Sequence, residues 1–345
     1  MHIPVMTAEL LDWLAVRREG IYLDTTVGGA GHSRAILERL TSLGAGWLIA
    51  MDRDPSALEL ARERLSSLQN PGSPASCALV RQDFAGLRAG VARGLQQLSL
   101  SPRPDASSAS GTRVDGIIAD IGLSQMMLDD PHRGFSLKAS GPLDMRMDPD
   151  QELTADEVVN RWDERELARV IYEYGEERRS RRIARAIVRA RPVTTTVRLA
   201  EIIASCLGGS REAERSAARR KHSAHWDGAR TTGTSSGTFV HPATRVFQAL
   251  RIAVNQELEQ LTEFLKQVPE CLNPGGRLVV ISFHSLEDRI VKQQLQQWDR
   301  DGVMENLTRK VVKPSEAEIM ANRRARSAKL RVAMKPPFIQ TATHG

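Results

Sequence analysis

The stretch GIYLDTTVGGAGHS, residues 20–33, decides the fold of this 345-residue chain. Its β-type apolar residues predict a short strand over Gly20–Thr26. The glycine-rich loop Gly28–Gly31 follows, and His32–Leu40 then has apolar residues at helical spacing. Glycines at a strand end let the backbone approach a ligand, and the start of the next helix offers free N–H donors. The stretch therefore predicts a strand, a ligand-binding loop and a helix.

The alternation of strands and helices continues along the chain. A helix is expected over Pro55–Leu65, because it has proline near its start and apolar residues at helical spacing. Continuous apolar runs predict further strands over Trp47–Met51, Cys77–Val80, Val114–Ile121, Arg277–Phe283 and Lys329–Met334. Such alternation indicates an α/β fold with a parallel, doubly wound sheet.

A helical insert interrupts the predicted sheet between its fourth and fifth strands. From residue 154 to residue 203 the apolar residues recur at helical spacing. We therefore expect an all-helical insert over 129–238, inside a sheet domain formed by 1–128 plus 239–345. Residues 207–238 are rich in Gly, Ser, Thr and Arg and poor in large apolar groups, so we expect that segment to be mobile.

The composition is that of an ordinary globular protein, with 41 % hydrophobic and 26 % charged residues. Its three cysteines lie far apart without a CxxC pair, which argues against a disulfide framework or a four-thiolate zinc site and fits a reducing, cytoplasmic compartment. No run approaches 18 apolar residues, and the first ten residues do not resemble a secretory signal. We therefore expect no membrane partner.

The net charge of +6 is concentrated in two segments. Residues 176–191 contain seven Arg and two Glu, and residues 323–335 contain six cations and no acid. Clustered cations attract polyanions, of which nucleic acid is the usual one, although a solvated helix face is the alternative. The candidate RNA-binding residues are Arg178, Arg179, Arg181, Arg182, Arg323, Arg324 and Arg326.

Two acids beside the glycine-rich loop favour a particular ligand. Asp24 precedes Gly28; a carboxylate there would repel a dinucleotide pyrophosphate but suits a ligand with ammonium and sulfonium charges. Asp52 ends the next strand, where a doubly wound fold places an acid on ribose hydroxyls. Asp54 could compete for that role or simply start the following helix. The pair favours S-adenosylmethionine over NAD.

Other candidates follow the third and fourth strands. Asp83 and Phe84 occupy the loop expected beside an adenine, where Phe84 could cover the ring or belong to the core. Asp120 ends the fourth strand at the predicted ligand crevice. It could take part in proton transfer or hold a substrate amine, and the alternative is a cap for the next turn.

His284 follows the fifth strand and would also reach the crevice. The spacing of Ser285 and Asp288 resembles a capping box, which is the alternative interpretation there. A serine hydrolase is disfavoured because no GxSxG elbow is present. His222 and His225 have no ligand-type partners nearby, so no metal site is predicted.

Taken together, these residues resemble the bacterial small-subunit (16S) rRNA cytosine-N4 methyltransferase family. The resemblance covers nearly the whole chain. Its most specific part runs from Leu128-Asp129-Asp130 through Arg133-Gly134-Phe135-Ser136 to Asp148. The other matching stretches are His2–Met6, Gly20–Ser33, Ala50–Pro55, Tyr174–Glu177, Phe247–Glu257 and Ser282–Ile290.

The resemblance implies a Rossmann-like methyltransferase sheet with a helical insert, S-adenosylmethionine as donor, and a cytosine of the ribosomal decoding region as acceptor. By motif match it implies cofactor contacts at Ala30, Gly31, His32, Asp52, Phe84 and Asp120. One departure concerns Met127, which stands where the family usually has a cofactor-touching glutamine. Gln125, two residues away, is a candidate substitute.

The expected reaction is direct displacement of the sulfonium methyl by the cytosine amine, with Asp120 as the expected proton acceptor. The expected partner is small-subunit rRNA, either free or in the assembled subunit. Three other functions stay open: a methyltransferase acting on another RNA, a protein or a small molecule; a non-enzymatic RNA-binding protein; and an NAD-dependent dehydrogenase, which Asp24 disfavours.

Overall fold

The computed structural model describes residues 4–100, 112–207 and 241–337. The chain forms two compact units, one made of Met1–Met126 with Glu257–Gly345 and the other of Met127–Gln256. Apart from Leu207, the segment 207–238 lies outside the described residues, and so do His222 and His225. The second unit ends later than the expected 238. The reason is helix α11 (Thr244–Asn255), which packs through Ala249 and Ala253 on Val170 of the helical unit.

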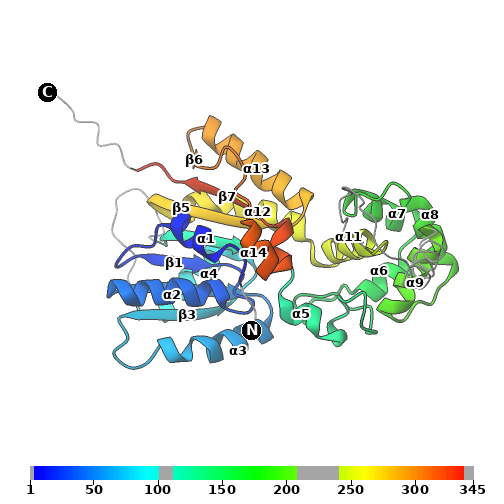
Figure 1. Cartoon of the computed structure of the whole chain (residues 1–345), viewed down its shortest axis with the longest axis horizontal. Coiled ribbons are helices and arrows are strands. Elements are labelled where there is room, and N and C mark those ends of the chain that lie inside the picture. The colour runs from blue at the N-terminus through cyan, green and yellow to red at the C-terminus, as the bar shows by residue number, and fades with distance from the viewer. Residues whose placement is uncertain (1–3, 101–111, 208–240, 338–345) are drawn as a thin grey trace, which may run out of the picture. The chain divides into compact units, whose positions relative to one another are not determined.

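A seven-stranded sheet forms the centre of the first unit (Figure 1). The strands are β1 (Ile21–Asp24), β2 (Gly46–Asp52), β3 (Ala75–Arg81), β4 (Val114–Asp120), β5 (Leu272–Ser282), β6 (Glu305–Asn306) and β7 (Lys329–Met334). Their order is β3-β2-β1-β4-β5-β7-β6. Neighbours from β3 to β5 are parallel, as predicted, but β7 runs antiparallel to β5. It does so because β7 starts at the edge where β5 ends, with Lys329 beside Ser282.

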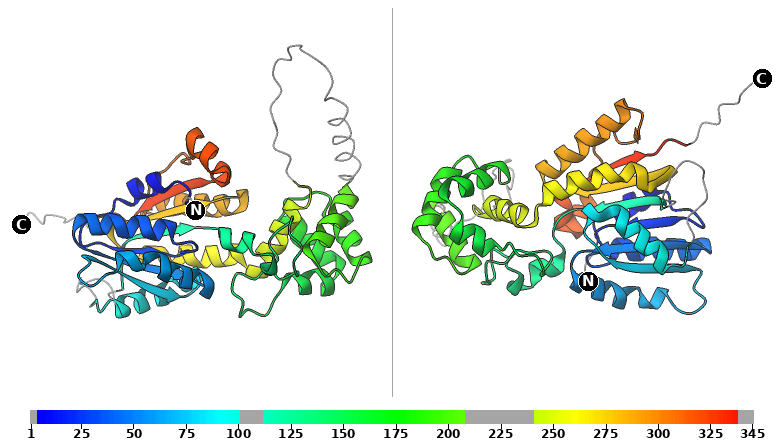
Figure 2. Two further views of the ribbon diagram at one scale, coloured as in Figure 1. Left: turned by 60° about the horizontal axis from the view of Figure 1, so that its bottom comes forward. Right: turned by 180° about the vertical axis from the view of Figure 1, so that it is seen from behind.

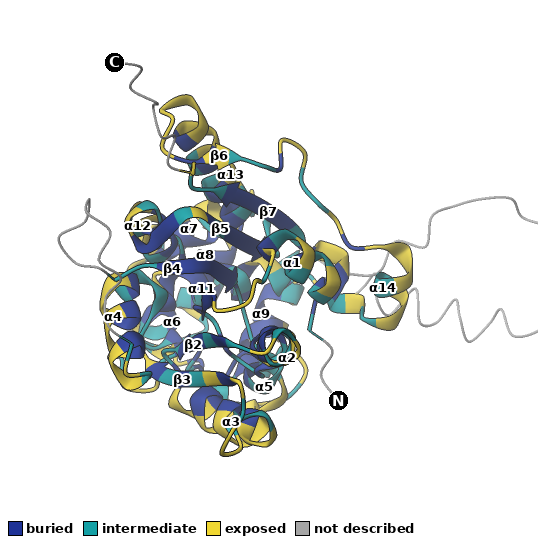
Figure 3. Ribbon diagram, turned by 90° about the vertical axis from the view of Figure 1, so that its left-hand side faces the viewer, coloured by how far each residue is buried: buried dark blue, intermediate teal, exposed yellow. Residues whose placement is uncertain are grey.

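Helices cover both faces of the sheet (Figure 2). One face carries α1 (Thr7–Leu14), α2 (Gly31–Leu43) and α3 (Pro55–Leu65), and the other carries α4 (Leu87–Gln97), α12 (Glu257–Cys271) and α13 (Ser285–Arg300). Successive strand residues alternate between the two cores: Tyr22 packs with the first set and Leu23 with the second. The strands are accordingly buried, whereas the outer sides of the helices are exposed (Figure 3). The α/β prediction is confirmed.

The strand register brings the candidate acids to one edge of the sheet. Asp24 pairs with Ala50 of β2 and with Ile118 of β4, so β1, β2 and β4 end at nearly the same level. Asp52 and Asp120 are the last residues of β2 and β4. In parallel sheets the ligand crevice lies at the carboxyl ends of the strands.

The second unit contains the helices expected from the pattern over 154–203. They are α6 (Ala155–Arg161), α7 (Glu164–Glu173), α8 (Ser180–Arg189), α9 (Thr196–Leu207) and, beyond that pattern, α11. Side-chain caps define two starts: Thr154 accepts from the Glu157 nitrogen at 3.2 Å, and Asp163 accepts from the Arg165 nitrogen at 2.7 Å. α5 (Gln125–Asp129) lies at the boundary of the two units.

The long loop before α6 is fastened to the end of α11 by Asn255. The side-chain amide of Asn255 donates to the Met145 carbonyl at 2.7 Å and accepts from the Met147 nitrogen at 2.7 Å. Asn255 is 1 % exposed, so these bonds form away from water. These bonds hold Met145 and Met147 against the end of α11, so residues 141–148 belong structurally to the helical unit. Among the described residues no helix is both long and apolar enough to cross a membrane.

Candidate functional site

The glycine-rich loop between β1 and α2 is built around the carboxylate of Asp24. Its Oδ1 accepts a hydrogen bond from the Thr26 nitrogen at 3.0 Å, and its Oδ2 accepts one from the Ser33 hydroxyl at 2.6 Å. Asp24 is 1 % exposed, and burial raises the pKa of its carboxyl above the usual value. Both oxygens of the Asp24 carboxyl group therefore hold the loop in its shape.

The backbone of the loop is left-handed at Gly28 (φ 45°) and at Ala30 (φ 59°). Such a conformation costs a non-glycine residue about 1–2 kcal/mol, a cost that Ala30 bears and a glycine would not. Ala30 is the N-cap residue of α2, and its side chain does not cap the first turn of the helix. The N–H groups of that first turn are the kind of donors that suit an anionic ligand group.

Asp52 at the end of β2 joins the loop to its own strand. Oδ2 accepts from the Gly28 nitrogen and Oδ1 from the Asp54 nitrogen, both at 2.9 Å. Burial raises the pKa of Asp52 to about 6. Asp54 is fully buried and caps α3 by accepting from the Ser56 nitrogen at 2.9 Å, which is the helix-starting role considered for it. Asp54 is thus used as a helix cap, and Asp52 stays the predicted contact for ligand hydroxyls.

Asp83 and Phe84 follow β3 as expected, and the structure engages both. Asp83 caps a short 3-10 helix, Phe84–Gly86, by accepting from the Gly86 nitrogen at 2.9 Å. The half-buried ring of Phe84 meets Phe264 of α12 edge to face, with centroids 5.7 Å apart. Phe84 therefore packs against the core, and its partial exposure is compatible with the predicted cofactor contact.

Asp120 at the end of β4 has one oxygen that the protein does not satisfy. Its Oδ1 is buried and has no hydrogen-bond partner among the described residues. Burial raises the pKa of the Asp120 carboxyl to about 6. The charges of Asp24 and Glu287 raise it further, and those of His32 and Arg324 oppose the rise. The unsatisfied Oδ1 lies at the carboxyl end of β4, and it suits a hydrogen-bond donor that a ligand would supply.

His32 lies in the first turn of α2, beside Asp120. Its Nε2 is 2.8 Å from the carbonyl oxygen of Val5, and its Nδ1 is 3.6 Å from Oδ2 of Asp120. The segment that contains Val5 lies directly on this turn, because a Cβ atom placed on Gly31 would meet the Cβ of Pro4 at 2.8 Å. The N-terminal segment is thus part of the site.

Arg324 connects the C-terminal basic run with the loop after Asp120. It lies in a 3-10 helix, η4 (Arg323–Ser327), and donates to the Leu123 carbonyl at 2.6 Å and to Oε1 of Gln125 at 3.0 Å. The guanidinium is therefore bonded to the loop that follows Asp120. Arg323 and Arg326 are exposed and stay predictions as RNA contacts, as does Arg324.

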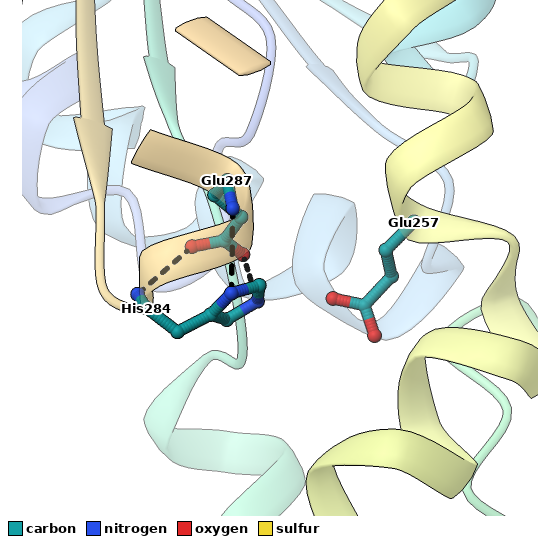
Figure 4. A group of neighbouring side chains, drawn as sticks. All are labelled: Glu257, His284 and Glu287. Atoms are coloured by element: carbon teal, nitrogen blue, oxygen red, sulfur yellow. Dashed lines mark hydrogen bonds and ion pairs between the residues drawn. The ribbon is translucent and has the colours of Figure 1, made fainter. Parts of the chain in front are cut away.

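Three metal-ligand-type side chains, Glu257, His284 and Glu287, gather where α12 and α13 begin (Figure 4), with one atom from each within 4.8 Å of the others. Oε2 of Glu287 accepts from the His284 nitrogen at 3.3 Å, and Nδ1 of His284 accepts from the Glu287 nitrogen at 3.4 Å. His284 and Glu287 thus form a capping box. The expected box residue Asp288 instead forms an ion pair with Arg331 at 2.7 Å.

This cap decides what the cluster can hold. Because Nδ1 of His284 accepts a main-chain N–H, the hydrogen-bond pattern assigns the ring proton of the neutral imidazole to Nε2. Nε2 lies 2.9 Å from Oε1 of Glu287. A metal-ligating nitrogen must be unprotonated, so the group fits a hydrogen-bonded helix cap rather than a metal centre.

The arginines of α8 lie on one side of the helical unit. The helix runs from Ser180 to Arg189 and buries Ile183, Ala184 and Ile187. On its exposed side is a hollow of about 540 Å³, whose lining includes Arg182, Arg185, Arg189 and Arg198. Arg185 and Arg198 have acidic partners, at 3.3 Å each, in Glu164 and Glu201. Arg179 donates to the Leu207 carbonyl at 3.3 Å.

Sequence reasoning missed several contributors. Thr26 Oγ1 accepts from the Asp120 nitrogen at 2.8 Å, and the Ser33 hydroxyl donates to Asp24. Neither contact has a signal in local spacing, because the partners belong to different elements. The role of Val5 is also missed, since it rests on a carbonyl oxygen that every residue has.

Comparison with known proteins adds independent findings. The model of the MraW methylase family matches residues 1–336. A ribosomal RNA small subunit methyltransferase H from Koribacter versatilis is 46 % identical over 336 residues, 97 % of this chain and 94 % of that protein. The protein of that name from Acidobacterium capsulatum is 48 % identical over 334 residues, 97 % of this chain and 98 % of that protein. A solved rRNA methylase from Streptococcus thermophilus aligns with 97 % of this chain and 99 % of its own at 11 % identity and a TM-score of 0.39.

Proposed function

Because the chain belongs to the MraW methylase family, we propose that it methylates the exocyclic N4 amine of a cytosine in the decoding region of small-subunit (16S) rRNA. It is an rRNA methyltransferase, and S-adenosylmethionine is its methyl donor. The identity to relatives named ribosomal RNA small subunit methyltransferase H extends over nearly the whole of both chains, so it includes the sheet unit and the helical unit.

One observation carries the proposal at the level of atoms: the buried Oδ1 of Asp120 has no donor among the described residues. A donor from outside the protein is needed to satisfy it, and an exocyclic amine carries two N–H donors. S-adenosylmethionine supplies an electrophilic methyl group on a positively charged sulfur. A carboxyl group at Asp24 and a carboxylate at Asp120 suit such a cation at this edge of the sheet.

The glycine-rich loop and the strand ends would contact different parts of S-adenosylmethionine. Asp52 presents the remaining lone pairs of a carboxylate to ribose hydroxyls, since each of its oxygens accepts one main-chain hydrogen bond and has room for another. The first turn of α2 offers N–H groups to an anionic group of the ligand. Phe84, which follows the third strand, is the proposed neighbour of the adenine ring.

Asp120 has a second task at the amine. The N4 lone pair is delocalised into the cytosine ring, so the amine is a weak nucleophile and has to be held in line with the methyl group at about 3–3.5 Å. A hydrogen bond from the amine to Asp120 orients it and provides an acceptor for the proton that it loses.

The helical unit offers a surface for the RNA backbone. The arginines around the hollow on α8 and α9 are a source of phosphate contacts that position RNA without reading its sequence. The target base has to leave its stack to reach a crevice, which is easiest in looped RNA. We propose small-subunit rRNA, either free or in the assembled subunit, as the partner, and the cytoplasm as the compartment because ribosomes assemble there in bacteria.

The proposal is tested by mass spectrometry of 16S rRNA from a deletion strain complemented with the wild-type gene or with Asp120→Ala. N4-methylcytidine should be absent from the decoding-region fragment of the deletion strain, return with the wild type, and not return with Asp120→Ala. Purified protein is then given labelled S-adenosylmethionine with deproteinised rRNA, small subunits or ribosomal proteins. Unchanged methylcytidine in the deletion strain, or label in protein alone, would contradict the proposal.

A further inference from the structure

The N-terminal segment fixes the tautomer of His32. Nε2 of His32 is 2.8 Å from the carbonyl oxygen of Val5, and a carbonyl oxygen can only accept. Nε2 therefore carries the ring proton, and the lone pair of the neutral ring is on Nδ1. His32 is 5 % exposed, so water does not compete freely for either nitrogen.

That lone pair faces a carboxylate. Nδ1 of His32 lies 3.6 Å from Oδ2 of Asp120, slightly beyond hydrogen-bond length. Two acceptors face each other favourably only when a proton is present on one of them. Hydrogen bonds of this kind are often long without substrate and tighten in the reactive complex.

We propose that His32 is the proton acceptor behind Asp120 in the methylation of the cytosine amine. This inference rests on the proposed function. Attack by the N4 lone pair forms the N–C bond while the electron pair of the C–S bond goes to sulfur, which leaves one surplus proton on the amine. Oδ1 of Asp120 takes this proton, and the proton already present on Oδ2 moves to Nδ1 of His32. The imidazolium then loses it to solvent after the methylated base has left.

Several charged groups act on this pair from different elements. Asp24 of β1 and Glu287 of α13 favour a proton on the pair, and Arg324 of η4 opposes it. Burial raises the pKa of Asp120 to about 6, so its carboxyl can take up and release a proton near neutral pH. The buried Oδ1 stays available for the amine while Oδ2 faces His32.

The rest of the N-terminal segment supports the same arrangement. Pro4 packs against Gly31, and the Met6 nitrogen donates to Oε1 of Glu318 in α14 (Glu316–Ala321). These contacts lie on both sides of Val5, so its carbonyl is held against His32. His32 thus accepts a proton through Asp120 and does not itself touch the reacting amine.

The pair is tested first without substrate. Long-range ¹H–¹⁵N NMR of the full chain reads the tautomer of His32, whose signals are identified by their loss in His32→Gln. We expect the proton on Nε2 and a change at Nδ1 over the pH range in which Asp120 protonates, near 6. In Asp120→Asn this change should move or vanish. A proton on Nδ1, or the same titration in Asp120→Asn, would overturn the proposal.

Kinetics on the complete substrate provide the second test. His32→Gln keeps a side-chain N–H for the Val5 carbonyl but removes the titratable Nδ1. Its affinity for S-adenosylmethionine should stay close to that of the wild type, while kcat falls about 10- to 100-fold and the pH profile of kcat changes shape. His241→Gln, at an exposed position, is the matched control and should keep both values.

The outcomes separate the two claims. If His32→Gln keeps the wild-type kcat and pH profile, the transfer to His32 is wrong. If it loses affinity for S-adenosylmethionine while the pH profile of kcat keeps its shape, the imidazole only supports the cofactor site and the transfer is again wrong. If the wild-type chain methylates no rRNA, the proposed function fails, and the NMR titration still decides whether His32 and Asp120 share a proton.

Discussion

The main-chain nitrogen of Gly28 donates a 2.9 Å hydrogen bond to Oδ2 of Asp52, so one carboxylate ties the glycine-rich loop to the end of the neighbouring strand. The other oxygen accepts from the Asp54 nitrogen at 2.9 Å and thereby also fixes the start of α3. Each carboxylate oxygen can accept a further bond. Asp52 therefore shapes the loop and offers acceptors to a ligand at the same time.

We predict that Asp52→Ala weakens S-adenosylmethionine binding about 10- to 150-fold, because a charge-assisted hydrogen-bond pair contributes about 1.5–3 kcal/mol. Calorimetric titration measures the affinity, and circular dichroism checks that the variant is folded. Asp52→Asn keeps an acceptor without the charge and should show a smaller loss. An unchanged dissociation constant in folded Asp52→Ala would remove Asp52 from the cofactor site.

The affinity for S-adenosylmethionine should also depend on pH. Burial raises the pKa of Asp52 to about 6 in the free protein, and the ionised form is the better acceptor for ribose hydroxyls. Binding should therefore exchange no proton with solvent at pH 7.5 and release one proton below pH about 6. In that lower range the affinity should fall by up to about tenfold per pH unit. Calorimetry in two buffers of different ionisation enthalpy measures the proton. A flat affinity from pH 7.5 to pH 5 would contradict this expectation.

Asp120→Asn should stabilise the unliganded protein at neutral pH. The folded-state pKa of about 6 lies above the usual 3.8, so the folded protein binds the proton more tightly than the unfolded chain, and ionising Asp120 costs stability as pH rises through this window. The cost above pH 6 is about 2–3 kcal/mol. Asn carries no such cost, so the gain should be present at pH 7.5 and absent near pH 3.5.

Urea unfolding at the two pH values measures this difference. The exposed Asp12 of α1 is the control, and Asp12→Asn should give little change at either pH. If Asp120→Asn is no more stable than the wild type at pH 7.5, the carboxylate is better solvated than its burial indicates.

The sheet could be predicted because its strands are buried on both faces and appear as uninterrupted apolar runs, as in Trp47–Met51. The first residues of β5 were missed, since Asn273, Pro274 and the two glycines that follow are typical of a turn. β6 has two residues and no pattern to detect. The direction of β7 depends on where the chain re-enters the sheet, which no local period records.

The acids of the site could be placed because they end strands, and strand ends meet at one edge. The partners of those acids could not. The Val5 carbonyl on His32 and Arg324 on Leu123 are contacts between distant segments. The domain boundary was misplaced for a related reason: α11 lies beyond the 207–238 segment in sequence but packs on Val170 of the helical unit.

The last prediction concerns the arginines of the helical unit. Arg178, Arg181, Arg182 and Arg189 form no ion pair with any described residue. Glu177, one of the two acids in this run, lies 3.8 Å from Arg245 instead. These four cations are therefore better candidates for phosphate contacts than Arg179, which donates to the Leu207 carbonyl.

Replacing these four arginines with glutamine should flatten the salt dependence of binding to small-subunit rRNA, measured as the slope of log affinity against log salt concentration. Each phosphate contact on a single strand adds about 0.7 to that slope, so four lost contacts should reduce it by about 3. Affinity for S-adenosylmethionine should not change, because its proposed site is in the sheet unit. The matched control removes four exposed cations that already have acidic partners, namely Arg62, Arg161, Arg169 and Lys266, and should keep most of the slope. If the first variant keeps the wild-type slope while the protein still binds RNA, the helical unit does not hold the backbone. The exposed Arg323 and Arg326 of η4 then become the residues to replace.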